Sequence, residues 1–349
     1  MSSDAKASVL LVGTGVVGSA ILGILQGETS LPIALTAVAN TRGLVPTGGR
    51  TLSADDVKEL RARPRTDAGG PVIDDAALDA LASRAHPVLV DATAAEGMED
   101  LYLRALSRGI HVVTANKKPL VVAYAKRQEL FDPSKRRNGA RFRYEATVGA
   151  GLPVIETLKD LVRTGDRVNK IECVLSGTLG FVANELYAGT ALSVAIAVAK
   201  DRGYTEPDPR EDLGGADVAR KAVILARELG ATLETSEVDL TPFVPTYVKP
   251  TELDMEVAAR VKRLAERGEK LVYLARIERQ GERIVASAGP LAVPLAHPAA
   301  SLSGSSALVA FTTARYASEP LVVRGSGAGG AVTASAVLAD VLKATGLHG

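Results

Sequence analysis

The feature that most constrains the fold of this chain is a glycine-rich loop that follows a short apolar run. Residues 9–12 read Val-Leu-Leu-Val, and residues 13–18 match the pattern G-x-G-x-x-G. A buried strand, a tight turn and a helix over about residues 16–25 account for the whole stretch. In such a unit the glycines permit the turn, the approach of a pyrophosphate and close helix packing. A purely structural glycine turn is the alternative. The loop therefore predicts a dinucleotide site formed by Gly13, Thr14, Gly15, Val16, Val17 and Gly18.

The same stretch is open to a second interpretation, because Val9 to Leu25 carries no charged residue. A signal-peptide core or a short membrane span has this composition. However, residues 1–8 contain both Asp4 and Lys6 and so supply no net positive charge, and glycines interrupt the run. We therefore expect no membrane segment, and we expect a cytoplasmic protein.

Strand-like and helix-like segments alternate along the first 150 residues. Strands are predicted at 33–39, 87–91 and 111–114, helices at 55–63, 76–82 and 100–108, and a connection at 42–49. Such alternation implies right-handed crossovers and a parallel sheet. Later segments read as helices, a hairpin around Gln280-Gly281, and a strand at 320–324 that leads into a closing helix. The sequence predicts an α/β protein with a Rossmann-type parallel-sheet nucleotide-binding domain and a second, α+β domain.

Composition narrows the possible functions. The chain has 349 residues, with 41 Lys+Arg against 40 Asp+Glu and 46% hydrophobic residues. These values are typical of a globular protein and argue against a nucleic-acid partner, which needs a strongly basic surface. The single cysteine, Cys173, excludes an internal disulfide, and the four histidines lack metal-ligand spacing. We expect a small-molecule substrate and neither nucleic acid nor a membrane as a partner.

The end of the second predicted strand bears on the choice between NAD and NADP. An acidic residue near this point normally accepts a hydrogen bond from the ribose 2′-hydroxyl of NAD. Residues 39–42 here read Ala-Asn-Thr-Arg, without a carboxylate, and Arg42 is able to pair with a 2′-phosphate. The sequence favours NADP, with NAD possible, and with Asn40 and Arg42 in contact with the cofactor. A loop arginine facing water is the alternative for Arg42.

Two lysines are candidates for a catalytic role, although sequence spacing alone establishes that role for neither of them. Lys117, like Thr93, follows a predicted strand at the edge where ligands of parallel sheets bind, but Lys117 and Lys118 also suit a solvated pair. Lys221 follows Asp217 by four residues on a predicted helix, opposite its apolar stripe, so periodicity alone makes them an exposed ion pair.

An acidic loop over residues 203–212 precedes that helix. Carboxylates and a lysine together suit a substrate with an amino group and a carbonyl, where the lysine donates a proton as hydride reaches carbon. Cys173 has no neighbouring base and reads as a buried strand residue rather than a nucleophile.

The sequence resembles the homoserine dehydrogenase family over nearly its whole length. The resemblance is carried by the glycine loop, Thr114-Ala-Asn-Lys-Lys-Pro119, Tyr144-Glu-Ala-Thr-Val-Gly-Ala-Gly-Leu-Pro153, Ser176-Gly-Thr-Leu-Gly180, residues 203–221 and Gly327-Ala-Gly-Gly-Ala-Val-Thr-Ala334. It implies the reversible reduction of L-aspartate 4-semialdehyde to L-homoserine with NADPH or NADH, in threonine, methionine and isoleucine biosynthesis.

The resemblance also implies roles for individual residues. Lys221 is the expected proton donor to the aldehyde oxygen, with Asp217 and Lys117 as further catalytic residues. The substrate is expected to contact Glu206, Asp212, Asp217, Gly177, Thr178 and Tyr204. Thr93, Lys117 and Gly329 join the cofactor contacts named above. A monovalent cation, usually sodium, is expected on the Glu145 carboxylate and the backbone carbonyls of Val148, Ala150 and Leu152, because a hard cation prefers oxygen ligands.

The resemblance further predicts how the chain is organised. It implies an NAD(P)-binding domain at 1–152, a catalytic domain at 153–285, a dimerisation segment at 286–325 in a homodimer, and a C-terminal helix at 326–349 that returns to the first domain. We expect a short form with neither an ACT domain nor an aspartate kinase domain. Two alternatives stay open, namely another semialdehyde oxidoreductase and a non-catalytic NADP-binding sensor with the same fold.

Overall fold

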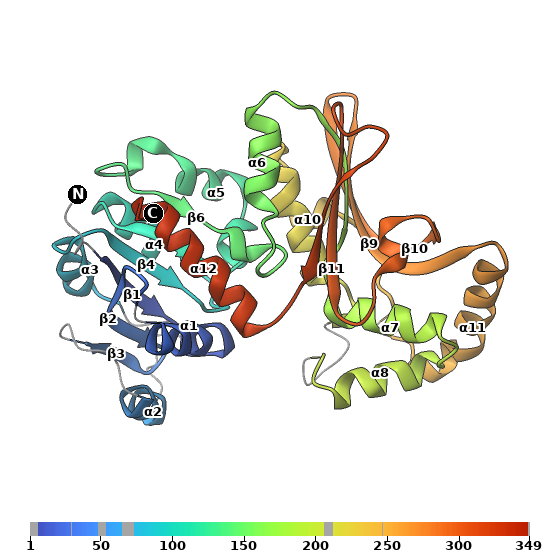
Figure 1. Cartoon of the computed structure of the whole chain (residues 1–349), viewed down its shortest axis with the longest axis horizontal. Helices are drawn as coiled ribbons and strands as arrows, with labels where there is room; N and C mark the ends of the chain where they lie inside the picture. The colour runs from blue at the N-terminus through green and yellow to red at the C-terminus, as the bar shows by residue number, and fades with distance from the viewer. Residues whose placement is uncertain are drawn as a thin grey trace. The chain divides into compact units, whose positions relative to one another are not determined.

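The computed structural model describes residues 6–28, 30–47, 54–64, 73–205, 212–245 and 247–347. The chain divides into two compact units (Figure 1). Unit 1 comprises residues 1–151 together with 329–349, and unit 2 comprises residues 152–328. Each unit has its own six-stranded sheet.

The sheet of unit 1 has the strand order β3-β2-β1-β4-β5-β6. Its strands are β1 (Ala7–Val12), β2 (Ile33–Asn40), β3 (Gly43–Pro46), β4 (Pro87–Asp91), β5 (His111–Thr114) and β6 (Phe142–Arg143). All neighbours pair in parallel except β3, which runs antiparallel to β2. The predicted Rossmann-type parallel sheet is confirmed. The connection predicted at 42–49 was wrong in part, because residues 43–46 form an edge strand.

Helices cover this sheet and complete its core. They are α1 (Val16–Gly27), α2 (Ala54–Ala62), α3 (Asp75–Ala82), α4 (Glu99–Ser107), α5 (Tyr124–Phe131) and α12 (Gly330–Thr345), with 3-10 turns η1 (Lys118–Leu120), η2 (Pro133–Lys135) and η3 (Glu145–Thr147). The C-terminal helix α12, red in Figure 1, packs against α1. Its Val337 and Val341 are buried in one apolar cluster with Val9, Leu11 and Ile21. Unit 1 therefore draws its core from both of its sequence segments.

The sheet of unit 2 has the order β12-β11-β7-β9-β10-β8. Its strands are β7 (Val168–Val174), β8 (Asp239–Leu240), β9 (Glu269–Gln280), β10 (Arg283–Pro294), β11 (Ser306–Thr313) and β12 (Leu321–Ser326). The pairings are antiparallel except that β8 runs parallel to β10. The predicted hairpin around Gln280-Gly281 is confirmed and is longer than predicted. Strand β11 was not predicted.

Unit 2 also carries α6 (Ile155–Arg163), α7 (Gly177–Tyr187), α8 (Leu192–Asp201), α10 (Ala216–Glu228), α11 (Pro250–Glu266), η4 (Thr235–Glu237) and η5 (Pro298–Ser301). Helix α10 packs on β9 and β10. On β9, Leu271, Tyr273 and Ala275 alternate with Val272 and Leu274, and all five side chains are buried. Both faces of this central strand are therefore covered, as its apolar sequence requires. Among the described helices, none is both long enough and apolar enough for a membrane span.

Candidate active site

The glycine loop of unit 1 contains glycines that the protein itself requires and one that it does not. Gly13 has φ +102°, and a Cβ atom on Gly18 would lie 2.0 Å from the Gly13 carbonyl oxygen. Gly15 has φ −73°, which any residue adopts, and a Cβ atom there would meet no protein atom within 4 Å. Since no contact of the described chain explains Gly15, the open space in front of α1 fits a ligand that approaches the backbone. The residues of the loop thus fit a dinucleotide.

Polar side chains gather around this loop at the end of β2. Asn40 Nδ2 donates to Thr14 Oγ1 at 3.1 Å, and the Arg42 N–H donates to Asn40 Oδ1 at 2.7 Å. Arg42 Nη1 donates to the carbonyl of Arg63. These contacts hold the end of β2 beside the glycine loop, where the predicted contacts Asn40 and Arg42 were expected.

Arg61 is a further residue of this region that sequence reasoning missed. Its guanidinium donates to the Thr14 carbonyl and to Ser19 Oγ. Helix α2 brings Arg61 to the loop from a position 47 residues beyond Thr14. No local spacing in the sequence signals such a contact. Arg61 and Arg42 together give this end of the sheet positive charge, which suits a phosphate.

The second glycine run also reaches the loop. Gly329 has φ +127° and precedes α12. A Cβ atom on the following residue, Gly330, would lie 2.9 Å from Val16 Cγ1. The predicted cofactor contacts Gly329 and Val16 therefore belong to one neighbourhood of unit 1.

Thr93 and Lys117 lie in turns that follow β4 and β5, two neighbouring parallel strands. The Thr93 N–H donates to Asp91 Oδ1 at 2.8 Å. Lys118 Nζ forms an exposed pair with Glu96 Oε1 at 3.1 Å. Lys118 thus lies at the surface, as the solvated-pair interpretation predicts for it.

In unit 2, Lys221 is held between two oxygen acceptors. Its Nζ donates to the Leu175 carbonyl at 2.6 Å and lies 2.8 Å from Asp217 Oδ2. The Lys221 side chain is only 11% exposed, whereas that of Asp217 is 47% exposed. The exposed ion pair that periodicity predicts was therefore wrong for Lys221. The cause is Leu175 at the end of β7, which provides a buried acceptor that the helix pattern does not reveal.

The start of α7 lies next to the Lys221 amine, because Leu175 is joined through Ser176 to Gly177 and Thr178. Ser176 Oγ accepts from the Leu179 N–H at 3.2 Å and caps the helix. Thr178 Oγ1 donates to the Tyr204 carbonyl, and the Tyr204 ring packs on Phe181 with 5.2 Å between centroids. Unit 2 therefore gathers Lys221, Asp217, Gly177, Thr178 and Tyr204 around the end of β7.

The acidic loop is described only at its ends. Glu206 lies outside the described residues. Asp212 lies four residues before the first residue of α10, and its carbonyl accepts from the Gly215 N–H at 3.2 Å. Gly215 has φ +76°, and a Cβ atom there would lie 1.9 Å from Tyr273 Oη. The close approach to Tyr273, a residue that sequence reasoning missed, leaves no room for a side chain at the residue that precedes α10.

The segment expected to bind a cation begins with η3, whose first residue is Glu145. Glu145 is buried, and its N–H donates to Asp340 Oδ2 at 2.9 Å. Gly149 and Ala150 have φ +82° and +56°, so the backbone curls sharply here. In the described part of the chain no three His, Cys, Asp or Glu side chains converge as a metal site would need. The expected cation site differs from such a cluster, because Val148 and Ala150 would contribute backbone carbonyls rather than side chains. The fourth expected ligand, Leu152, is the first residue of unit 2.

Cys173 is wholly buried in β7. Burial, together with the negative charge of Glu172, raises the pKa of its thiol. A nucleophilic cysteine needs the opposite, a pKa low enough to form thiolate.

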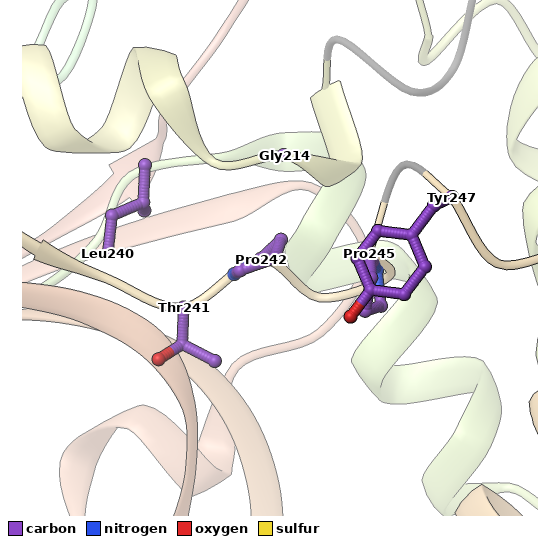
Figure 2. Close-up of a pocket in the computed structure, with 6 residues that line it drawn as sticks. All are labelled: Gly214, Leu240, Thr241, Pro242, Pro245 and Tyr247. Carbon is purple, nitrogen blue, oxygen red and sulfur yellow. The ribbon is translucent and has the colours of Figure 1, made fainter.

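A cavity of about 480 Å³ opens beside Gly214, just before α10. Figure 2 shows its walls, which are formed by Gly214, Leu240, Thr241, Pro242, Pro245 and Tyr247. Its lining is mostly apolar and includes no charged residue. None of the predicted site residues lines it.

Comparisons with known proteins agree with this geometry. A sequence model of homoserine dehydrogenase matches residues 153–342, and one of the homoserine dehydrogenase NAD binding domain matches residues 13–145. The chain is 36% identical over 98% of its length to a homoserine dehydrogenase of Schizosaccharomyces pombe, of which it covers 96%.

The chain is also 36% identical, over 98% of its length, to bifunctional aspartokinase/homoserine dehydrogenase 1 of Zea mays, but it spans only 38% of that relative. Among solved structures, a hyperthermophilic archaeal homoserine dehydrogenase in complex with NADPH superimposes with a TM-score of 0.74 at 24% identity, over 99% of each chain. This last likeness is one of fold.

Proposed function

The chain belongs to the homoserine dehydrogenase family, and on this basis we propose that it catalyses the reversible reduction of L-aspartate 4-semialdehyde to L-homoserine with NADPH or NADH. This reaction lies on the route to threonine, methionine and isoleucine. The observation that carries the proposal is the Lys221 amine, held at 2.6 Å from the Leu175 carbonyl and 2.8 Å from Asp217.

Lys221 is the proton donor in the proposed mechanism. When bound, the reduced cofactor supplies a hydride to the aldehyde carbon, so the carbonyl oxygen becomes negative and needs a proton. Lys221 gives that proton from Nζ, and in the reverse direction it takes the proton from the homoserine hydroxyl. Leu175 and Asp217 hold Nζ in one position. The entropic cost of orienting the proton donor in the transition state is therefore smaller.

Carboxylates hold the amino end of the substrate. Glu206, Asp212 and Asp217 supply negative charge for the substrate ammonium, and Gly177, Thr178 and Tyr204 line the same place. The contacts of Thr178 with Tyr204 and of Tyr204 with Phe181 support this assignment, because they brace the segment that faces the substrate.

Unit 1 binds the cofactor in this proposal. The loop from Gly13 to Gly18 binds the pyrophosphate, and Asn40 and Arg42 bind the ribose end of the cofactor. The rest of the cofactor contacts Thr93, Lys117 and Gly329. The positive charge of Arg42 and the lack of a carboxylate at residues 39–42 support NADP over NAD. A structural relative that was solved with NADPH adds support. Lys117 also contacts the substrate.

Two further properties are proposed from the family. A monovalent cation, sodium by preference, binds Glu145 and the carbonyls of Val148, Ala150 and Leu152. The chain forms a homodimer through residues 286–325.

The first test is an assay of NADPH oxidation with aspartate semialdehyde, compared with NADH and with other aldehydes. We expect turnover with aspartate semialdehyde. A protein that binds NADPH but turns over no aldehyde would be a sensor instead. Phosphate-dependent oxidation of a semialdehyde by NADP+ that is lost in Cys173→Ser would favour a phosphorylating dehydrogenase.

The second test is Lys221→Ala. Loss of the proton donor should lower kcat at least about 10²-fold while the Kd for NADPH stays unchanged. Lys262→Ala, an exposed lysine on α11 of the same unit, is the control and should leave kcat unchanged. Turnover near that of the wild type in Lys221→Ala would refute the mechanism.

A further inference from the structure

A fully buried carboxylate lies at the carboxyl end of β4. Asp91 is 0% exposed. Its Oδ1 accepts from the Thr93 N–H at 2.8 Å, and its Oδ2 accepts from Tyr102 Oη at 2.5 Å and from Asn116 Nδ2 at 3.2 Å. Each of these three groups is a neutral donor. Burying a carboxylate without a cation costs several kcal/mol even when donors replace water, so an apolar residue would serve packing better.

The donors to Asp91 come from two adjacent turns. The bond from the Thr93 N–H closes the turn after β4, and the bond from Asn116 reaches into the turn after β5. Asn116 extends this connection, since its Nδ2 also donates to the Ala95 carbonyl at 2.8 Å and its Oδ1 accepts from the Lys118 N–H at 3.1 Å. A single carboxylate therefore ties together the two turns that carry Thr93 and Lys117.

Tyr102, on α4, is a further member of this hydrogen-bond network. Tyr102 is fully buried, and its Oη lies 2.9 Å from Thr114 Oγ1 as well as 2.5 Å from Asp91. The Asn116 N–H in turn donates to Thr114 Oγ1 at 2.9 Å. Burial and the charge of Asp91 raise the pKa of Tyr102 well above its usual value, so Tyr102 remains a donor at all working pH values. All the groups that surround the carboxylate are thus fixed by α4, β5 or a turn.

We propose that Asp91 is a positioning residue of the cofactor site, which joins the turns after β4 and β5 and thereby aims Thr93 and Lys117. The inference rests on the proposed function, because it takes these two residues to contact the cofactor. The glycine loop after β1 belongs to the first half of the sheet, so β4 and β5 belong to the half that takes the nicotinamide end of a dinucleotide. Asp91 would therefore act on nicotinamide placement through other residues.

The test compares Asp91→Asn with a matched buried aspartate of unit 2. Asp91→Asn preserves the shape of the side chain. It also replaces one acceptor oxygen with an amide NH2 group that faces the donors of Asn116 and Tyr102. We expect the Kd for NADPH to rise about tenfold or more and kcat at saturating cofactor to fall by roughly 10–10²-fold, the effect of a misplaced contact. Both are measured well below the melting temperature of each variant, by calorimetric titration and steady-state kinetics.

Asp166→Asn is the control. Asp166 is also buried, and it accepts from Thr313 Oγ1 at 2.7 Å and from the Arg315 N–H at 3.2 Å. The same substitution there should lower Tm but leave the Kd for NADPH within twofold of the wild type. Tyr102→Phe removes one of the three donors and should give a smaller rise in Kd than Asp91→Asn. It also serves as the test variant if Asp91→Asn does not fold.

The outcomes separate this inference from the proposed function. An Asp91→Asn variant, or in its place a Tyr102→Phe variant, that loses Tm but keeps the Kd and kcat of the wild type would overturn the positioning role. The Kd measurement needs no turnover, so it decides the role of Asp91 even if the wild type reduces no aldehyde. A wild type that binds neither NADPH nor NADH would overturn both proposals.

Discussion

Gly15 and Gly18 belong to one loop and differ in what a methyl group would meet. A Cβ atom on Gly18 would lie 2.0 Å from the Gly13 carbonyl oxygen, whereas one on Gly15 would meet open space. Gly18→Ala should therefore destabilise unit 1 by at least about 1–3 kcal/mol, because overpacking outweighs the helix propensity of alanine. Gly15→Ala should leave Tm nearly unchanged and raise the Kd for NADPH about tenfold or more. Thermal unfolding and calorimetric titration of both variants check this, and equal losses of Tm would contradict it.

Arg42 is the residue on which the choice of cofactor depends. Replacing it removes a charged donor, and a hydrogen bond to a charged group is worth about 1.5–3 kcal/mol. We expect Arg42→Ala to raise the KM for NADPH by roughly 10–10²-fold and the KM for NADH far less. Arg137→Ala, an exposed arginine of the same unit, is the control. If both cofactors were affected equally, Arg42 would not contact a 2′-phosphate.

Lys221 shows what sequence reasoning at the residue scale can and cannot reach. The family motif identifies it, and its spacing from Asp217 correctly predicts their ion pair. Its burial was not predicted, because the acceptor is the carbonyl of Leu175, 46 residues earlier. Contacts of this kind depend on backbone atoms of a distant strand, and no side-chain pattern encodes them. Arg61 was missed for the same reason.

At the scale of elements, the sequence predicted α10 and the β9–β10 hairpin but missed strands β3 and β11. Helix α10 and the β9–β10 hairpin have regular apolar patterns and a turn at Gln280-Gly281, and both are present. Strand β11 reads as a short apolar run, and a strand buried on both faces lacks the alternation that would identify it. Strand β3 is an edge strand in a glycine- and proline-rich connection, and only its pairing with β2 makes it a strand.

The N-terminus of α10 depends on one glycine. Gly215 combines φ +76° with a Cβ position only 1.9 Å from Tyr273 Oη, whereas Gly230, just beyond the helix, has φ +91° and open space. Gly230→Ala should cost about 1–2 kcal/mol of unfolding free energy, the strain of a left-handed alanine. Gly215→Ala should cost more and should also lower kcat, because α10 carries Asp217 and Lys221. Denaturant unfolding and kinetics check both variants, and an unchanged kcat in Gly215→Ala would show that the helix start does not aim Lys221.

At the scale of the whole molecule, the two units carry titrating groups with different pH ranges. In unit 1, burial and the charges of Arg141 and His86 lower the pKa of His111 from 6.5 to about 4, and its Nδ1 accepts from the Arg141 N–H at 2.9 Å. In unit 2, burial opposes ionisation of Glu172, but hydrogen bonds from His297, Lys170 and Arg276 outweigh it and lower its pKa from 4.5 to about 2. Both folded-state pKa values lie below the unfolded ones, so both groups make the fold more stable at neutral pH than in acid.

The stability from His111 should be complete above pH 6.5 and lost as the pH falls toward 4. The stability from Glu172 should be complete above pH 4.5 and lost as the pH falls toward 2. We therefore expect unit 1 to lose stability at a higher pH than unit 2, as measured by hydrogen exchange from pH 7 to 3. In His111→Gln, whose neutral side chain still accepts a hydrogen bond, the dependence between pH 6.5 and 4 should flatten. A wild-type slope in that variant would assign the loss to other groups.

The discontinuity of unit 1 has a consequence for biosynthesis. A ribosome releases the strands of this sheet first, but Val337 and Val341, which close its core, emerge only after all of unit 2 has been made. Unit 2 is contiguous and is free to fold while translation continues. During that interval the apolar surface of β1 and α1 that α12 will cover stays open to chaperones and to neighbouring nascent chains. The nucleotide-binding half, although translated first, is thus the last to mature.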